Sequence, residues 1–339
     1  MQSLVAFRKP CAVRPGDTVA VVAPAGPFER SALEAGVAVI GERYRVRYDE
    51  RIYSRKRYLA GDDDRRLAEL TSALADPEIK AVFCARGGYG AMRLLGRLAS
   101  WWESGSRSGT FGSGAERGPG LGLVGKPLVG FSDITALHQW LQSNGIVSIH
   151  GPVLSQLGRL PGETGAAVAV TSPVGSPQRL FSLLESTSLP AEPLVGTDTY
   201  VGGTAEGPLL GGNLSVFTRL LGTPFMPPLE GAILLLEDLS EQPYRLDRMW
   251  THLELAGVFR KIRGIALGQF LGCEPRDGGF TAAEVLRELA DATGLPCAAG
   301  FPIGHGDVNE PVALGVRVRL DAGARRLTFL EAAVGAAAG

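Results

Sequence analysis

Short apolar runs alternate with amphipathic segments through the first part of the chain. Residues 17–25 (DTVAVVAPA) predict a buried first strand, because they form an apolar, β-branched run that is followed by glycine. Residues 61–79 predict a helix, since their leucines recur at helical spacing, aspartates fill the first turn and a proline follows the end. Residues 80–85 predict another buried strand. This alternation indicates an α/β domain built on a parallel sheet.

Another junction between strand and helix lies at residues 128–136, which read LVGFSDITA. An apolar run predicts a strand up to Phe131, and apolar residues three or four positions apart predict a helix after Ser132. In nucleophilic hydrolases a serine on such a turn attacks a carbonyl, and the free N–H groups of the helix hold the oxyanion. The alternative is a helix N-cap, a position that serine favours. Ile134 replaces the second glycine of G-x-S-x-G, so this segment leaves both interpretations open.

Residues 101–125 interrupt the alternation of strand and helix. Their sequence is of low complexity and rich in glycine and serine, which is typical of a mobile surface loop. We expect the sheet to resume only at residue 128, with the strand that leads to Ser132.

The order weakens again at residues 158–193, where glycine, proline, serine and threonine are frequent. Beyond this point, apolar or alternating runs predict strands at residues 231–236, 262–270, 312–320 and 326–329, the last two antiparallel. Helices are predicted at residues 243–256 and 280–289. We therefore predict an N-terminal parallel-sheet α/β domain (1–160), a linker (161–194) and a smaller, mixed, β-rich C-terminal domain (195–339).

Composition narrows the class of protein. With 339 residues, 45% of them hydrophobic and 20% charged, the chain can bury the cores of two domains. A net charge of −1 argues against a nucleic-acid partner, which would require a clustered basic surface. No run of 18 apolar residues and no apolar leader core is present, so we expect neither a membrane span nor a signal peptide. Four scattered cysteines favour a reducing compartment, and the cytoplasm is the predicted location.

The chain contains four histidines, which are the natural candidates for a general base. His138 and His252 lie in predicted amphipathic helices, so we interpret both as packing or surface residues. His150 closes a predicted strand, and it either lines a cleft or is structural. His305 lies between two glycines in a loop after a strand, where the imidazole can be reached. His305 is therefore the preferred candidate for a base that takes a proton from serine.

Glu237 is the candidate partner for that base. It ends a wholly apolar run, where a carboxylate is costly unless it is paired or at the surface. It is either a charge at the end of a strand or the acid that orients His305. The adjacent Asp238 is the alternative candidate for that acid. The order serine, acid, histidine along the chain matches that of α/β-hydrolases.

Gly87, Gly88 and Gly90 lie between a predicted strand and a predicted helix. A dinucleotide fingerprint would need a third glycine that this segment lacks, and no phosphate-binding P-loop pattern is present. We interpret the segment as a backbone N–H turn that approaches a bound oxyanion. Paired Cys/His ligand spacings are absent as well, so we expect no cofactor and no metal.

Six segments in a fixed order closely resemble the serine LD-carboxypeptidases, also called muramoyl-tetrapeptide carboxypeptidases, and the related microcin-immunity peptidases. They are ARGGYGAMRLL (85–95), LVGFSDITALH (128–138), HGP (150–152), GGNLSVFTRLLGTP (211–224), LLLEDLSEQPYRLDRMW (234–250) and GHGD (304–307). The resemblance spans about residues 16–330, and the segment at 101–125 looks longer and richer in glycine than the family pattern.

The resemblance implies roles for particular residues. Ser132 would be the nucleophile, Glu237 the acid and His305 the base. The backbone donors of the oxyanion hole would be Asp133 and either Gly87 or Gly88.

The resemblance also implies a fold and a reaction. An N-terminal α/β domain and a smaller β-rich domain would bring the three side chains together at their junction, commonly in a homodimer. The substrate would be a small peptide with an L-to-D bond near its free carboxyl end, such as murein tetrapeptide, and no metal would be needed. One alternative is a microcin-immunity-type peptidase that cleaves a peptide-nucleotide or an acyl amide. The other is a non-catalytic protein that binds peptides.

Overall fold

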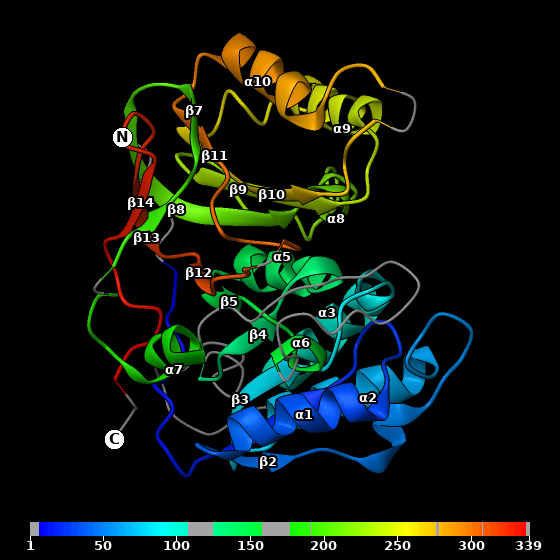
Figure 1. Cartoon of the computed structure of the whole chain (residues 1–339). Coiled ribbons are helices and arrows are strands. Elements are labelled where there is room, and N and C mark those ends of the chain that lie inside the picture. Colours follow the sequence, from blue (N-terminus) through cyan, green and yellow to red (C-terminus); the bar gives the residue numbers. More distant parts are fainter. Residues whose placement is uncertain are drawn as a thin grey trace.

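The computed structural model describes residues 7–107, 125–157, 177–190, 192–275, 278–306 and 308–336. Within these residues the strands form two sheets, one of six strands and one of eight. Figure 1 shows the two sheets in separate halves of the molecule, each with helices of its own, and helix α5 (Thr135–Ser143) between them.

The first sheet has the strand order β12-β5-β4-β3-β1-β2, and β12 is the one strand in it that runs antiparallel to its neighbour. Its strands are β1 (Thr18–Val22), β2 (Arg45–Arg47), β3 (Ile79–Cys84), β4 (Leu128–Gly130), β5 (Ser148–His150) and β12 (Val312–Leu314). The residues of β1 alternate between two apolar cores, so both faces of the sheet are buried. This confirms the predicted α/β domain with a parallel sheet.

Helices cover both faces of the first sheet. One core contains apolar residues of α2 (Asp63–Ala75), α3 (Leu95–Arg107) and α5. The opposite core contains residues of α1 (Arg30–Gly41), α6 (Leu154–Leu157) and α7 (Pro177–Glu185). Short 3₁₀ turns complete this half at η1 (Glu50–Tyr53), η2 (Ala91–Leu94) and η3 (Ser132–Ile134).

The second sheet is mixed, with the order β6-β14-β13-β8-β9-β10-β11-β7 and a parallel centre formed by β8 to β11. Its strands are β6 (Leu194–Val195), β7 (Asp198–Val201), β8 (Thr204–Asn213), β9 (Ile233–Leu239), β10 (Gly264–Leu271), β11 (Cys297–Ala299), β13 (Arg317–Asp321) and β14 (Arg326–Phe329). Helices α8 (Leu214–Thr218), α9 (Pro243–Leu255) and α10 (Ala282–Thr293) share one apolar core with this sheet. The predicted mixed β-rich half and the antiparallel final pair are confirmed.

One prediction about strands in this half is wrong, and one strand was missed. The predicted strand at residues 312–320 is two strands, because β12 joins the first sheet beside β5 while β13 joins the second sheet beside β8. Gly315, with a φ of +95°, separates them. Strand β8, at the centre of the second sheet, was not predicted, since its sequence TAEGPLLGGN carries three glycines and a proline that disfavour strands.

The predicted loop at residues 101–125 also needs correction at its start. Helix α3 continues through Arg107, and residues 108–124 lie outside the described part of the chain. Within the predicted linker, α7 buries Leu180, Leu183 and Leu184 in the apolar core that also contains residues of α1 and α6. The domain limits at 160 and 195 stay a prediction.

Hydrogen bonds between the two halves fix their relative position near Ser132. The Oγ of Thr135, in α5, accepts a hydrogen bond from the backbone N–H of Asn213 at 3.0 Å. Gln139, one turn later, donates to the carbonyl of Gly211 at 2.8 Å. Asn213 pairs in register with Glu237 of the neighbouring strand β9. The helix that follows Ser132 is therefore joined to the strand that carries Glu237.

Candidate active site

Ser132 is the first residue of η3, on the sharp turn between β4 and α5 at the carboxyl edge of the parallel sheet. Its φ is +63°, in the left-handed region that a non-glycine residue rarely adopts. Its side chain is partly exposed, whereas residues 133–142 of the same turn and helix are all buried. The N-cap of η3 is Phe131, and no side-chain cap is present on η3 or α5. The N-cap interpretation of Ser132 is therefore not supported. The strained turn has the geometry of a nucleophile elbow, and the role of Ser132 as a nucleophile stays a prediction.

The incomplete elbow motif has a steric reason. A Cβ on Gly130 would lie 3.0 Å from two side-chain carbons of Ile134, so the two residues already fill the space between strand and helix. A side chain at position 130 would therefore crowd Ile134, whereas the turn accommodates isoleucine at position 134.

The glycine turn after β3 passes directly against Ser132. A Cβ on Gly87 would lie 2.8 Å from the Cβ of Ser132 and 3.1 Å from its Oγ, which leaves no room for a side chain. The carbonyl of Gly87 accepts a hydrogen bond from the N–H of Gly26 at 3.0 Å. Gly88, with a φ of +101°, continues the turn along the same cavity as Ser132 and Asp133. The two glycines, Ser132 and Asp133 therefore lie together at this turn.

The backbone donors in this region are available to a ligand. In the described part of the chain, neither the N–H of Gly88 nor that of Asp133 donates to a protein acceptor. The carboxyl group of Asp133 is occupied elsewhere, because it accepts the N–H of Ala91 at 2.8 Å. Burial raises the pKa of this carboxyl to about 6, although hydrogen bonds from the backbone and the nearby Arg66 oppose that rise.

Glu237 and His305 form a buried pair. The Nδ1 of His305 lies 2.6 Å from the Oε2 of Glu237, and both side chains are almost completely buried. Burial lowers the pKa of His305, but the charge of Glu237 and its hydrogen bond to the ring more than offset this, so the pKa lies above its usual value. A Cβ on Gly304 would lie 2.6 Å from the same Oε2, so only glycine lets the histidine loop approach the acid.

The choice between Glu237 and Asp238 follows from strand geometry. Successive side chains of β9 point to opposite faces, and Leu235 and Leu236 lie in different apolar cores. Asp238 points to the face of α8, where it accepts hydrogen bonds from the Nδ2 of Asn213 and the N–H of Ser215, each at 2.9 Å. Asp238 therefore holds the start of α8, and Glu237 contacts the histidine.

The other three histidines are not placed to act as bases. His138 is buried, with Nε2 2.8 Å from the carbonyl of Gly130 and Nδ1 2.9 Å from the Oγ of Ser148. Burial lowers its pKa to about 4. His150 is fully buried beside the rings of Phe131 and His138, so the structural interpretation holds. His252 is exposed on α9, as expected.

The candidate residues share one cavity of about 850 Å³. Ser132, Asp133, Gly87, Gly88 and His305 line it, and Glu237 lies behind His305. The ring of Phe131, next to Ser132, lies 4.7 Å from the ring of His305 between centroids. Walls from both halves of the chain complete the cavity, including Tyr89, Gln156, Asn213, Arg219 and Glu241.

Sequence reasoning missed several residues of this region. Asn213 was predicted only as a helix cap, which it is, since its side chain accepts the N–H of Val216 at 3.1 Å. It also lines the cavity and binds Asp238. Arg66 is fully buried on α2, and its spacing of four from the apolar Leu70 is the signal that could have placed it on the buried face. Asp307 of the GHGD segment lies outside the described residues.

The described ranges hold no group of three or more His, Cys, Asp or Glu side chains arranged to bind a metal ion. In the same residues, every helix is too short or too polar to cross a bilayer.

Comparisons with known proteins identify the family of the chain. A family model described as the LD-carboxypeptidase N-terminal domain matches residues 19–151, and one described as the LD-carboxypeptidase C-terminal domain matches residues 206–320. A protein of Bacillus subtilis named "probable murein peptide carboxypeptidase" is 35% identical over 335 residues, covering 96% of this chain and 95% of the relative.

Two solved structures share the fold. The muramoyltetrapeptide carboxypeptidase from Oxalobacter formigenes is 28% identical, with a TM-score of 0.73 over 92% of this chain and 97% of its own. MccF in complex with glutamyl sulfamoyl guanosine is 19% identical, with a TM-score of 0.76 over 97% of this chain and 100% of its own, which is a likeness of fold alone. Because both halves match the family models and a full-length relative shares more than a third of its residues, the chain belongs to the LD-carboxypeptidase family.

Proposed function

We propose that this LD-carboxypeptidase is a serine peptidase, which hydrolyses an L,D-peptide bond and releases a C-terminal D-amino acid through an acyl-enzyme. The observation that carries the proposal is the strained backbone of Ser132, with its φ of +63°, on a turn that faces the cavity shared with His305. Strain of this kind persists where a side chain has to be presented to a ligand.

The chemistry follows from the positions of the groups. Ser132 Oγ attacks the carbonyl carbon of the scissile bond while His305 takes its proton. The carboxylate of Glu237 accepts the Nδ1–H of His305, which leaves Nε2 as the basic nitrogen and stabilises the imidazolium. His305 then donates the proton to the leaving amine, and the C–N bond breaks. Water, deprotonated by His305, hydrolyses the ester and restores Ser132.

The oxyanion of the tetrahedral intermediate would be held by the amides of Asp133 and Gly88. Gly88 is preferred to Gly87 because the carbonyl of Gly87 accepts from Gly26. In a trans peptide the carbonyl and the following N–H point to opposite sides, and the described chain has no cis peptide bond. The N–H of Gly88 therefore points away from Gly26.

The cavity suits a peptide that carries charges of both signs. Arg86 and Arg219 supply positive charge to its wall, and Glu29 and Glu241 supply negative charge. A murein-type tetrapeptide with free carboxyl and amino groups matches this mixture better than an apolar substrate would. The predicted homodimer and cytoplasmic location stay predictions, and sedimentation velocity tests the first.

Three substrates test the proposed function. We expect release of D-alanine from a murein tetrapeptide, and no release of L-alanine from the same peptide with an all-L carboxyl end. Faster cleavage of a glutamyl sulfamoyl nucleoside than of the tetrapeptide would favour the microcin-immunity alternative. Binding of the tetrapeptide with no product from any of the three would favour the non-catalytic alternative.

Gly87→Ala is expected to lower kcat by about 10²-fold, because a 1 Å displacement of a reacting group costs about that much. The new methyl would lie 2.8 Å from the Cβ of Ser132, so the serine or the turn has to move. The control is Gly96→Ala on α3, where an added Cβ meets nothing within 4 Å. A Gly87→Ala protein with the kcat of wild type would contradict the close approach of the turn to Ser132.

A further inference from the structure

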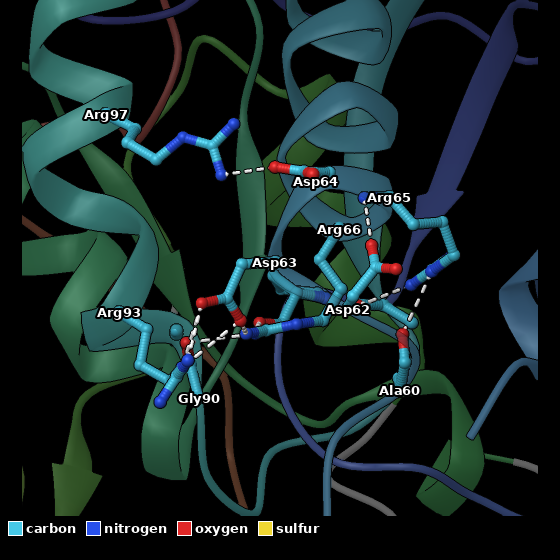
Figure 2. Close-up of polar contacts among 12 residues, drawn as sticks. Ala60, Asp62, Asp63, Asp64, Arg65, Arg66, Gly90, Arg93 and Arg97 are labelled. Carbon is cyan, nitrogen blue, oxygen red and sulfur yellow. Dashed lines mark hydrogen bonds and ion pairs between the residues drawn. The ribbon is translucent and has the colours of Figure 1, made fainter. Parts of the chain in front are cut away.

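Arg66 is a buried arginine that the proposed mechanism does not use. It lies on α2 with 0% exposure, on the same face as Leu70 and Leu74. A buried guanidinium is costly unless its donors are paired; both Nη atoms of Arg66 have partners, whereas its buried Nε has none among the described residues. Figure 2 shows that Arg66 points from α2 toward Gly90 and Asp63.

The hydrogen bonds of Arg66 join three segments of the chain. Its Nη1 donates to the carbonyl of Gly90 at 2.9 Å and to the carbonyl of Pro24. Its Nη2 donates to Asp63 at 2.5 Å. Pro24 is two residues before Gly26, whose N–H binds the carbonyl of Gly87. Arg66 therefore contacts both segments that meet at the Gly87–Gly88 turn.

One peptide group is held from both sides. The carbonyl of Gly90 accepts from Arg66, and the N–H of Ala91, in the same peptide, donates to the Oδ2 of Asp133 at 2.8 Å. Asp133 is itself the residue after Ser132, and its own amide is a proposed oxyanion donor. Arg66, the Gly90–Ala91 peptide and Asp133 thus form a continuous buried chain, which we call the peptide clamp.

The peptide clamp also constrains the conformation of Gly90. Its φ is +129°, and a Cβ there would lie 2.7 Å from the Nη1 of Arg66 and 2.5 Å from a methyl of Leu59. Position 90 therefore has no room for a side chain between Leu59 and the guanidinium. The turn from Gly87 to Gly90 is held at its end by Arg66 and at its start by Gly26.

We propose that Arg66 is a positioning residue for hydrolysis, which acts through the peptide clamp to keep the amides of Gly88 and Asp133 aimed at one oxyanion. The proposal rests on the proposed function, since it assigns a support to that oxyanion hole. A preorganised donor pair is effective only while both donors keep their geometry, because they stabilise charge that develops in the transition state. Substrate binding in the ground state needs the pair much less.

The clamp requires arginine rather than lysine. The planar guanidinium reaches two carbonyls and a carboxylate in a fixed geometry, whereas an ammonium on a flexible stem does not hold all three in place. Asp63 keeps a partner when Arg66 is removed, because Arg93 also binds it at 2.6 Å. A neutral side chain of similar volume at position 66 therefore leaves the carboxylate of Asp63 paired.

The test uses Arg66→Met and Arg66→Lys, with Arg97→Met as the matched control. Arg97 is a neighbour in Figure 2, but it is half exposed and binds Asp64 at 2.7 Å. Active sites are counted in each protein with a fluorophosphonate, so that kcat refers to labelled sites only. The readouts are kcat and KM for release of D-alanine from a murein tetrapeptide, and the Kd of a boronic acid analogue that forms a tetrahedral adduct.

We expect Arg66→Met to lower kcat per labelled site by about 10²-fold, the scale of losing one oxyanion donor. KM should change by less than about two-fold, and the boronic acid should bind more weakly by a factor similar to that in kcat. Arg66→Lys should show the same combination of a lower kcat, weaker boronic acid binding and a nearly unchanged KM. Arg97→Met should match wild type. A merely structural role would lower the labelled fraction and leave kcat per labelled site unchanged.

Wild-type kcat per labelled site and wild-type boronic acid affinity in a folded Arg66 variant would overturn the clamp. If Arg66→Met does not fold, Arg66→Lys decides in the same way. Failure of the proposed function is separate, because wild type would then carry no label, or Ser132→Ala would remain active. Labelled, active wild type together with unaffected Arg66 variants would reject the clamp alone.

Discussion

Replacing Ser132 by alanine is expected to lower kcat for hydrolysis of an L,D-peptide by about 10⁴-fold or more. Alanine cannot form the acyl-enzyme, so only binding and the backbone donors remain. The fold should persist, because the side chain of Ser132 makes no cap and faces the cavity. Release of D-alanine and the thermal midpoint check these two statements, and a folded Ser132→Ala protein with substantial activity would defeat the mechanism.

Ser132→Gly separates the backbone strain at this position from the chemical role of the hydroxyl. It should be as inactive as Ser132→Ala, because it also lacks the hydroxyl. Glycine adopts a φ of +63° without the steric cost that serine bears, which is about 1–2 kcal/mol, although its greater freedom in the unfolded chain offsets part of this. The free energy of unfolding should therefore be at least as high as in Ser132→Ala, as measured by urea titration. A clear loss of stability would count against strain at this position.

Glu237→Gln is expected to lower the maximal kcat by about 10⁴-fold and to move the acid limb of the pH profile. In wild type the pKa of His305 lies above its usual value, so kcat/KM should fall as the pH drops through that raised pKa. Without the carboxylate, burial dominates and lowers the pKa of the imidazole. The limb should therefore shift to lower pH in the variant, even though the plateau is lower.

The control for this experiment is Glu254→Gln, which removes an exposed carboxylate from α9. Its plateau and its acid limb should both match wild type. The measurement is kcat/KM for D-alanine release between pH 5 and 9. A limb that stays in place in Glu237→Gln, with chemistry limiting the rate, would mean that His305 is not the group that titrates.

Local patterns in the sequence predicted much of the fold. Apolar runs followed by turn residues identified β1, β3, β4 and β9, and helical spacing identified α2 and α9. These signals are local, because a buried strand and an amphipathic helix each produce a recognisable pattern of apolar residues within a short stretch of sequence. Strand β8 was missed because its glycines and proline disfavour a strand. The reason for a glycine lies in the neighbouring strand, since a Cβ on Gly211 would lie 2.0 Å from the carbonyl oxygen of Leu235.

The site was predictable only in part, for a related reason. The sequence identified Ser132, Glu237 and His305 as candidates, and the resemblance assigned their roles. The choice between Glu237 and Asp238 needed the face of β9 on which each lies, and that depends on a partner 68 residues away. The peptide clamp is less visible still, since Arg66 contacts backbone carbonyls, and no residue type in the sequence signals a carbonyl partner.

The central claim is that Ser132 Oγ forms a covalent bond with the substrate carbonyl in a relay with His305. The most direct measurement is the intact mass of the protein after reaction with a peptidyl fluorophosphonate, followed by peptide mapping. The account predicts one adduct per chain, on Ser132, absent in Ser132→Ala and formed much more slowly in His305→Gln. An adduct on another residue, or none at all in a preparation that still releases D-alanine, would contradict it.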